Sequence, residues 1–363
     1  MPPCLGERMY FREVDHVEMW VEDTGAAALF YVGTFGFHVV GRAEAGPEGR
    51  RSLLLQQGHL RLVLTEASGE GPSADFVRRH GDAVRDIALR VTDVEAAFRD
   101  AVRLGARPVS GPEVYGDGAA RVTRATVAAM GDVVHSFIQR ESRGGPEDFL
   151  PGVYQPVTEG FPLPSFEPFT ALDHLAIALE PGQLEPMVRF YRDVFGFHES
   201  HEENVRTGES GMNSKVMQND NGRICFPMME PARAGKPGQI DDFLARHGGA
   251  GVQHFAMLSH DIEAAIRALR SRGVDFLDIP PSYYEVLEER LGRLDLDVAR
   301  TRDYGILVDR DAWGLLLQAF TRSMHSRRTL FFEVIQRKDA RGFGGANIRA
   351  LFEAVEREQA RRP

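Results

Sequence analysis

The strongest constraint on the fold of this chain is an internal duplication. Four segments recur in the same order: VDHVEMWVED (14–23) as LDHLAIALEP (172–181), FGFH (35–38) as FGFH (195–198), FVRRHGDAVRDIALRVTDVEAAFRDAVRLGA (76–106) as FLARHGGAGVQHFAMLSHDIEAAIRALRSRGV (243–274), and FIQR (137–140) as VIQR (334–337). Chance does not produce four matches in one order, and a repeated unit governs the whole architecture. The sequence therefore predicts two copies of one structural module.

The duplication divides the chain into two domains and a connection. Residues 143–167 are rich in Pro and Gly, a composition typical of a linker. We therefore expect an N-terminal domain at 10–142 and a C-terminal domain at 168–363. The length of 363 residues suits this division, because single cores stop growing at about 250–300 residues.

Periodicity within each copy predicts an α+β fold. DHLAIAL, VQHFAML, GLLLQAF and TLFFEVIQ have the alternating or apolar composition of strands. LEPMVRFYRDVF (184–195) carries apolar residues at helical spacing and is followed by Gly196, whereas DIEAAIRALRSRG predicts an amphipathic helix ending at Gly273. Each copy therefore predicts βα units around a mostly antiparallel curved sheet. The charged amphipathic segment after residue 340 predicts a C-terminal helix.

Composition excludes several classes of function. The formal net charge is -10 and basic residues are not clustered, which argues against nucleic-acid binding. The two cysteines, Cys4 and Cys225, are too few for a disulfide framework or a four-thiolate metal site. The chain shows neither the apolar core of a signal peptide nor an apolar run of about 18 residues. We therefore expect a cytoplasmic protein without a membrane partner.

Comparison of the two copies position by position singles out a possible metal site in the second copy. His174, His254 and Glu333 each lie on a different predicted strand, where the first copy has His16, Asp86 and Ser136. Two histidines and one carboxylate suit non-haem iron(II), because three positions remain for a bidentate substrate and dioxygen. The first copy does not offer an equivalent set. Taken alone, the three residues leave metal ligation and a structural role in the sheet both open.

Longer motifs of the second half resemble the 4-hydroxyphenylpyruvate dioxygenase and 4-hydroxymandelate synthase family. The resemblance is dense over 170–360 and weaker over 10–140, and it is carried by FYRDVFGFHES, GQIDDFLARHGGAGVQHFAML, YGILVDRDAWGLLLQAFTRS and TLFFEVIQRKDARGFGGANIRALFEAVEREQ. It implies two tandem vicinal-oxygen-chelate domains, each of paired βαβββ modules forming a curved open β-barrel. It also implies that His174, His254 and Glu333 bind Fe(II). Family members commonly form dimers or tetramers, so we expect a homo-oligomer.

The same resemblance implies a pocket for a small 2-oxo acid and O2. Residues expected to line it are Ser214, Gln239, Gln318 and Phe331, with Phe343 on a tail helix that closes over it. A 2-oxo acid can chelate iron through its carboxylate and keto oxygens, so its phenol end needs only a few amides or hydroxyls. The substrate carries its own 2-oxo acid, so separate 2-oxoglutarate is not implied. For each of the three polar residues a structural role remains equally open.

Two departures favour the mandelate-forming member of the family. The ring-attacking type has Asn and Phe where this chain has Met229 and Ile348, whereas the mandelate-forming type is aliphatic at both places. Against this, Pro227 follows the ring-attacking type, and Leu315 replaces a Tyr expected in both. We expect 4-hydroxymandelate as the product, with Met229 and Ile348 deciding it, and homogentisate as the alternative. A role in antibiotic biosynthesis would follow only by analogy.

Functions from two other classes fit the same modules. One is a binding protein that only sequesters a small molecule, and the intact second-copy triad disfavours it. The other is a metal-dependent isomerase, lyase or ring-cleaving dioxygenase, which the family-like tail disfavours.

Overall fold

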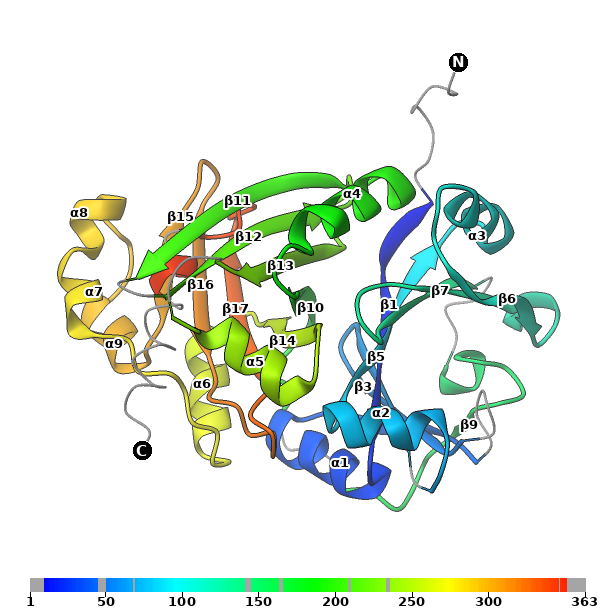
Figure 1. The fold of residues 1–363 in the computed structure, drawn as a ribbon. Coiled ribbons are helices and arrows are strands. Elements are labelled where there is room, and N and C mark those ends of the chain that lie inside the picture. Colours follow the sequence, from blue (N-terminus) through cyan, green and yellow to red (C-terminus); the bar gives the residue numbers. More distant parts are fainter. Residues whose placement is uncertain are drawn as a thin grey trace.

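The computed structural model describes residues 10–44, 50–67, 69–140, 145–162, 166–207, 210–232, 236–345 and 347–350. Its strands form two curved sheets, one for each copy of the repeat, and the two lie side by side (Figure 1). Among the described residues, no helix has the length and apolar character needed to cross a membrane. The α+β prediction of two tandem domains is confirmed.

The first domain is a nine-stranded sheet in the order β6-β7-β8-β5-β1-β4-β3-β2-β9. Its elements are β1 (Phe11–Val21), α1 (Thr24–Phe30), a π-helix (Tyr31–Phe35), β2 (His38–Ala43), β3 (Ser52–Gln57), β4 (Leu60–Glu66), α2 (Pro72–His80), β5 (Ala83–Val91), α3 (Val94–Arg103), β6 (Pro108–Tyr115), β7 (Val122–Ala128), β8 (Val134–Arg140) and β9 (Gln155–Pro156), with 3-10 turns at Gly118–Ala120 and Pro146–Asp148. The pairs β1·β4 and β5·β8 are parallel, and the other pairs are antiparallel. Two βαβββ modules thus meet at β1 and β5.

The second domain repeats this pattern in the order β11-β12-β13-β10-β14-β17-β16-β15. Its elements are β10 (Ala171–Ala178), α4 (Leu184–Phe195), β11 (His198–Thr207), β12 (Ser210–Gln218), β13 (Cys225–Pro231), α5 (Gln239–His247), β14 (Gly251–Leu258), α6 (Ile262–Arg270), α7 (Pro281–Glu285), α8 (Leu287–Leu291), α9 (Val298–Asp303), β15 (Leu307–Arg310), β16 (Leu315–Phe320) and β17 (Phe331–Lys338). The helices α7 to α9 lie between α6 and β15, where the first domain passes directly from α3 to β6. No elements were predicted for this insertion.

Local signals set the helix ends. The side chains of Asp23, Asp93 and Asp261 cap α1, α3 and α6 by accepting a backbone N–H three residues later, at 2.9 Å each. The helix α4 has the predicted bounds and ends at Gly196, whose φ of 74° is left-handed. The helix α6 ends at Arg270, earlier than the predicted Gly273, which lies in the turn that follows.

The tail after residue 340 begins without regular secondary structure, so Phe343 precedes the predicted helix and does not lie on it. Helical residues occur within 345–350. The rest of the predicted C-terminal helix, residues 351–363, lies outside the described residues.

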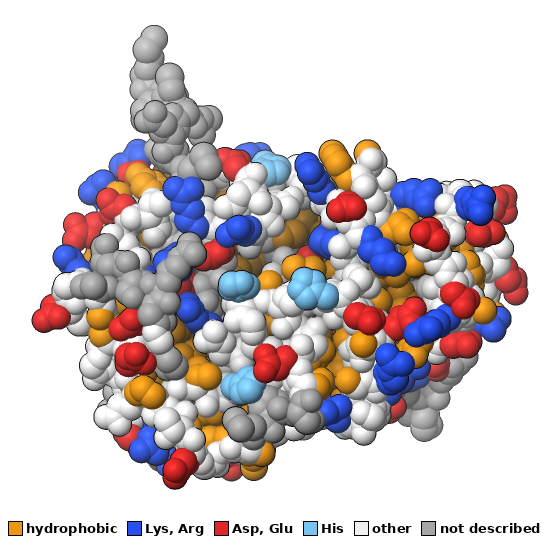
Figure 2. Space-filling model, turned by 180° about the vertical axis from the view of Figure 1, so that it is seen from behind, with side chains coloured by type: hydrophobic (Ala, Val, Ile, Leu, Met, Phe, Trp, Pro, Cys, Tyr) orange, Lys and Arg blue, Asp and Glu red, His pale blue; other side chains and the backbone are white. Residues whose placement is uncertain are grey.

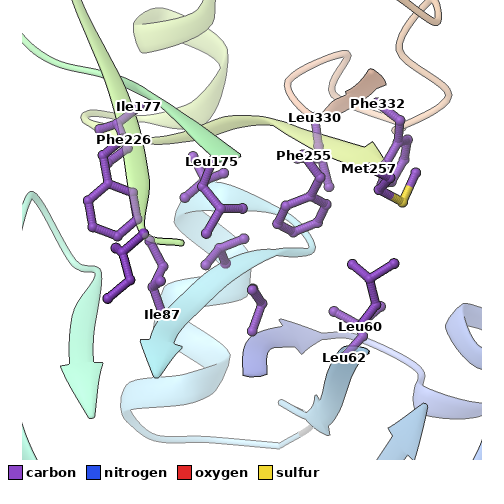
Figure 3. Close-up of a cluster of buried hydrophobic side chains, with 14 of the residues drawn as sticks. Leu60, Leu62, Ile87, Leu175, Ile177, Phe226, Phe255, Met257, Leu330 and Phe332 are labelled. Atoms are coloured by element: carbon purple, nitrogen blue, oxygen red, sulfur yellow. The ribbon is translucent and has the colours of Figure 1, made fainter. Parts of the chain in front are cut away.

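The outer faces of the two sheets share one apolar core. Figure 3 shows Leu60, Leu62 and Ile87 of the first domain in the same cluster as side chains of the second domain, labelled Leu175, Ile177, Phe226, Phe255, Met257, Leu330 and Phe332. Successive strand residues point to opposite faces. Leu175 and Ile177 therefore face this core, and their neighbours His174 and Ala176 face the concave side of the second sheet.

The concave side of the first sheet is filled by the predicted linker. Phe149, Leu150 and Tyr154 are buried there against Leu54 and Ile138, and β9 adds an edge strand beside β2. Residues 145–156 therefore belong to the packed structure of the first domain. On the surface seen from behind in Figure 2, basic and acidic side chains are interspersed, so this face carries no patch of one sign.

Candidate metal centre

Three buried side chains converge on the concave face of the second sheet. His174 lies on β10, His254 on β14 and Glu333 on β17, three strands that are adjacent in that order. Nε2 of His174 is 3.1 Å and Nε2 of His254 is 3.4 Å from Oε2 of Glu333. One possible ligand atom from each residue lies within 4.8 Å of the others. The structure thus brings the three predicted ligands together.

These separations fit a single divalent cation. Ligand bonds of about 2.1 Å at right angles place two donor atoms about 3 Å apart. Burial alone would lower the pKa of His174, but the carboxylates of Glu333 and Asp173 raise it to about 9. Burial lowers the pKa of His254. The imidazole of His254 and the buried carboxylate of Glu333 therefore face one point. The negative charge of the carboxylate would compensate a cation bound there.

Each of the two candidate ligand histidines is oriented by the residue that precedes it. Nδ1 of His174 is 2.9 Å from Oδ2 of Asp173, and Nδ1 of His254 is 3.4 Å from Oε1 of Gln253. Burial would raise the pKa of Asp173, but Arg337 and His174 hold it well below its usual range. An acceptor on Nδ1 leaves Nε2 free as the ligand atom. Neither residue was among those predicted, although the pair Asp-His, which recurs at 15–16 and 173–174, carried a signal for Asp173.

A chain of buried hydrogen bonds continues outward from Glu333. Gln318 donates from Nε2 to Oε1 of Glu333 at 2.8 Å, and its own Oε1 accepts from Nδ2 of Asn347 at 2.7 Å. Oδ1 of Asn347 accepts from the hydroxyl of Tyr283 on α7 at 2.8 Å, and Arg290 on α8 donates to that hydroxyl at 3.0 Å. The candidate ligand is thereby connected to the tail and to the helical insertion.

Aromatic rings cover the two histidines. The ring of Phe331 stacks on His254 with 4.7 Å between centroids, and the ring of Phe343 lies 4.8 Å from His174. Phe320, which the sequence analysis did not select, meets His254 edge-on at 6.0 Å. Apolar rings at this position exclude water from the donor atoms.

The residues predicted to decide the product lie in one apolar cluster. Met229 on β13 is buried, and Ile348 in the tail packs against the same group, which comprises Ala176, Ala178, Val205, Met212, Met229, Ile240 and Phe243. Ala176 and Ala178 share the inner face of β10 with His174, so the cluster adjoins the three ligands. Ser214 lies opposite Met229 in the register of β12 and β13. Gln239 is the first residue of α5, next to Ile240 of this cluster.

Comparisons with known proteins find relatives that match both domains of this chain. A family model described as the Glyoxalase/Bleomycin resistance protein/Dioxygenase superfamily matches residues 13–139 and 171–287, once in each domain. A 4-hydroxyphenylpyruvate dioxygenase of Yarrowia lipolytica is 35% identical over 97% of this chain and 93% of its own length. A probable 4-hydroxyphenylpyruvate dioxygenase of Aspergillus fumigatus is 39% identical over 96% of this chain and 94% of its own length.

A solved structure is similar to this chain over nearly its whole length. A triply substituted 4-hydroxymandelate synthase from Streptomyces coelicolor has a TM-score of 0.86 and 37% identity, over 97% of this chain and 100% of the other. The chain belongs to the 4-hydroxyphenylpyruvate dioxygenase-like family. It is therefore a dioxygenase of the group that includes 4-hydroxymandelate synthase.

The first domain of this dioxygenase replaces the metal-facing set with an internal ion pair. Asp86 stands where the second domain has His254, and its carboxylate accepts from the backbone N–H and hydroxyl of Ser136 at 2.9 and 2.5 Å. The guanidinium of Arg124 lies 3.4 Å from the same carboxylate and 3.1 Å from the Ser136 hydroxyl. A fixed cation thus compensates Asp86, while the ring of Phe149 covers His16 at 4.8 Å.

Proposed function

We propose that this dioxygenase binds iron(II) through His174, His254 and Glu333 and converts 4-hydroxyphenylpyruvate and O2 into 4-hydroxymandelate and CO2. The observation that carries the product assignment is the shared packing of Met229 and Ile348 beside the ligand strand β10. Aliphatic side chains at both places leave the substrate ring without a flat aromatic or an amide partner there.

Bound iron would supply a redox centre on which the 2-oxo acid and O2 can meet. The side chains of this chain have the complementary tasks. His174, His254 and Glu333 occupy three positions and leave the others open, and Gln318 holds the second oxygen of Glu333. Phe331 and Phe343 keep water away from the histidines. Because the substrate contains its own 2-oxo acid, we expect no second 2-oxo acid to be needed.

Further residues are proposed to line the substrate. Ser214 and Gln239 offer a hydroxyl and an amide from the elements that flank Met229. Such groups suit the phenol end of the substrate, because each can both donate and accept a hydrogen bond. Selection of the benzylic carbon would then depend on how the apolar cluster seats the aryl ring after decarboxylation.

Homogentisate is the second candidate product. It is favoured by the full-length similarity to proteins named 4-hydroxyphenylpyruvate dioxygenase. The two products are isomers, so molecular mass cannot separate them.

Product identification tests the proposal directly. The protein would be freed of metal under argon, reloaded with ferrous iron, and supplied with 4-hydroxyphenylpyruvate and O2. We expect O2 uptake only after reloading, without added 2-oxo acid, and 4-hydroxymandelate as the main product by chromatography against both standards. Homogentisate as the main product would overturn the product assignment. Full O2 uptake by the metal-free protein would overturn the iron assignment.

A further inference from the structure

In the first domain, one arginine connects a histidine to the segment that follows β8. Arg140 at the end of β8 donates to both carboxylate oxygens of Asp15 at 2.7 Å each, and Asp15 lies 2.8 Å from Nδ1 of His16. Nη1 of Arg140 donates to the carbonyls of Asp148, at 3.2 Å, and Phe149. The backbone held in this way places the Phe149 ring on His16.

The second domain repeats the arrangement around the candidate metal ligand. Arg337 on β17 donates to both oxygens of Asp173 at 2.6 and 2.9 Å, and Asp173 lies 2.9 Å from Nδ1 of His174. Nη1 of Arg337 donates to the carbonyl of Gly342 at 2.8 Å. The next residue, Phe343, lies on His174. The tail is therefore the counterpart of the segment that fills the first domain.

The tail has a second attachment that consists of one carboxylate. Oδ2 of Asp311 accepts the backbone N–H groups of Arg341 and Gly342 at 2.6 and 2.5 Å, and Oδ1 accepts those of Trp313 and Gly314 at 2.8 Å each. A Cβ at Gly314 would lie 1.9 Å from the carbonyl oxygen of Lys338, so the turn after β15 fits closely against the start of the tail. Asp311 thus joins that turn to the tail.

The two segments differ in how firmly they are held. Phe149 is 3% exposed and is packed with Leu150 and Tyr154 in an apolar cluster of the first domain. Phe343 is only half-buried, and the backbone of residues 341 and 342 is held by bonds to Asp311 and Arg337. On either side the chain is fixed more firmly, because Ala340 is buried in an apolar cluster and Asn347 is bonded to Gln318 and Tyr283. Individual hydrogen bonds contribute modestly to stability, which suits a cover that opens.

We infer that Arg337 is a positioning residue that couples the orientation of His174 to the closed tail. Asp311 holds the tail closed by accepting the N–H groups of Arg341 and Gly342. Asp173 transmits the coupling, because it binds both the imidazole and the guanidinium. An open tail would withdraw the Gly342 carbonyl from Arg337 and the Phe343 ring from His174. The inference rests on the proposed function for its iron-binding and turnover readouts, whereas amide exchange in the tail is independent of it.

Three variants separate the parts of this coupling. Arg337→Gln removes both the paired hydrogen bonds to Asp173 and the hydrogen bond to the carbonyl of Gly342. Asp311→Asn keeps an oxygen for the turn but presents an NH2 group to the N–H groups of Arg341 and Gly342. Arg140→Gln is the matched control, because Arg140 has the same kinds of partner around a histidine without the metal-facing set. Each protein would be compared by amide hydrogen exchange, anaerobic ferrous-iron titration, and product formed per O2 consumed.

The expected results differ for each variant. Asp311→Asn should raise exchange at the amides of 341 and 342 at least about tenfold and lower the product per O2. It should weaken iron binding by a smaller factor than Arg337→Gln does, because the bonds between Arg337 and Asp173 remain. Arg337→Gln should do the same to the tail and also weaken iron binding about tenfold or more. Arg140→Gln should change none of the three readouts.

Two results would overturn the inference. One is an unchanged rate of hydrogen exchange at the amides of 341 and 342 in folded Asp311→Asn protein. The other is that Arg337→Gln and Arg140→Gln have the same iron affinity and the same amide exchange rates in the tail. Both arginines would then have only a structural role. Exchange and iron titration need no substrate, so they decide the matter even if the unmodified protein fails to turn over 4-hydroxyphenylpyruvate.

Discussion

The side-chain amide of Gln318 donates a 2.8 Å hydrogen bond to Oε1 of Glu333. The same carboxylate presents its other oxygen to Nε2 of both His174 and His254. One oxygen is thus held by the protein, and the other is aimed at the candidate metal position. An amide that fixes a ligand in this way acts on metal affinity even without touching the metal.

Replacing Gln318 with Met should therefore weaken iron binding. Met has a similar volume but cannot donate, so Oε1 of Glu333 would lose its partner while buried. We expect iron affinity to fall about 10–100-fold, as for other residues that orient ligands. Competition with a chelator under argon measures this. A raised KM for 4-hydroxyphenylpyruvate with unchanged iron affinity would instead make Gln318 a substrate contact.

The metal should belong to the second domain alone. Changing His174, His254 or Glu333 to Ala should abolish both bound iron and turnover, since each removes a ligand from a three-residue set. His16→Ala is the matched control, because His16 has the same Asp and Arg environment but faces a domain in which Arg124 compensates the carboxylate. Loss of iron from folded His16→Ala protein, measured by metal analysis, would contradict the assignment.

The product should respond to the apolar cluster around Ile348. A Phe at 348 presents a ring face to the substrate and is expected to raise the homogentisate fraction, and Met229→Asn is expected to add to it. A difference of about 1.4 kcal/mol between competing barriers changes the product ratio tenfold. Ile348→Leu keeps an aliphatic side chain and should leave the ratio unchanged. Chromatography of the products decides, and equal ratios in the Phe and Leu variants would refute the role of this side chain.

Stability should fall as the pH is lowered, partly because of His135. This residue is fully buried, with Nδ1 2.8 Å from the carbonyl oxygen of Ile87 and Nε2 2.9 Å from the hydroxyl of Tyr191. Burial lowers the pKa of His135 from 6.5 to about 4. Between these values the unfolded chain binds a proton that the folded chain does not, so the folded state loses stability as the pH falls from 6.5 toward 4.

The size of this effect can be measured with one variant. The shift corresponds to a loss on the order of 3 kcal/mol across that range. His135→Gln should unfold more easily at pH 7, because the packing changes, but should lose less stability between pH 7 and pH 5. Free energies of unfolding, measured in urea at several pH values, give the change of stability with pH for the unmodified protein and for the variant. Parallel slopes for the two proteins would show that His135 does not contribute.

The repeat and the periodicity of this chain were sufficient to predict two copies of an α+β module, whereas the paired βαβββ architecture was implied by the family resemblance. Strand alternation and helical spacing are properties of short segments, so the bounds of α4 and its end at Gly196 could be read locally. The duplication then implied that both copies share one topology, and it marked the positions where they differ. His174, His254 and Glu333 emerged in this way because each lies on a strand whose counterpart was recognisable.

The contacts that link the ligands to the rest of the protein were decided by the tertiary structure. Arg337 and Asp173 are 164 residues apart, and Tyr283 and Asn347 are 64 residues apart. No periodic pattern specifies such pairs, since they depend on how three strands and a tail come together in space. For the same reason the sequence indicated only a linker at the segment that contains Phe149. Pro and Gly mark a connection between domains, but the packing of Phe149 in the first domain depends on the tertiary structure.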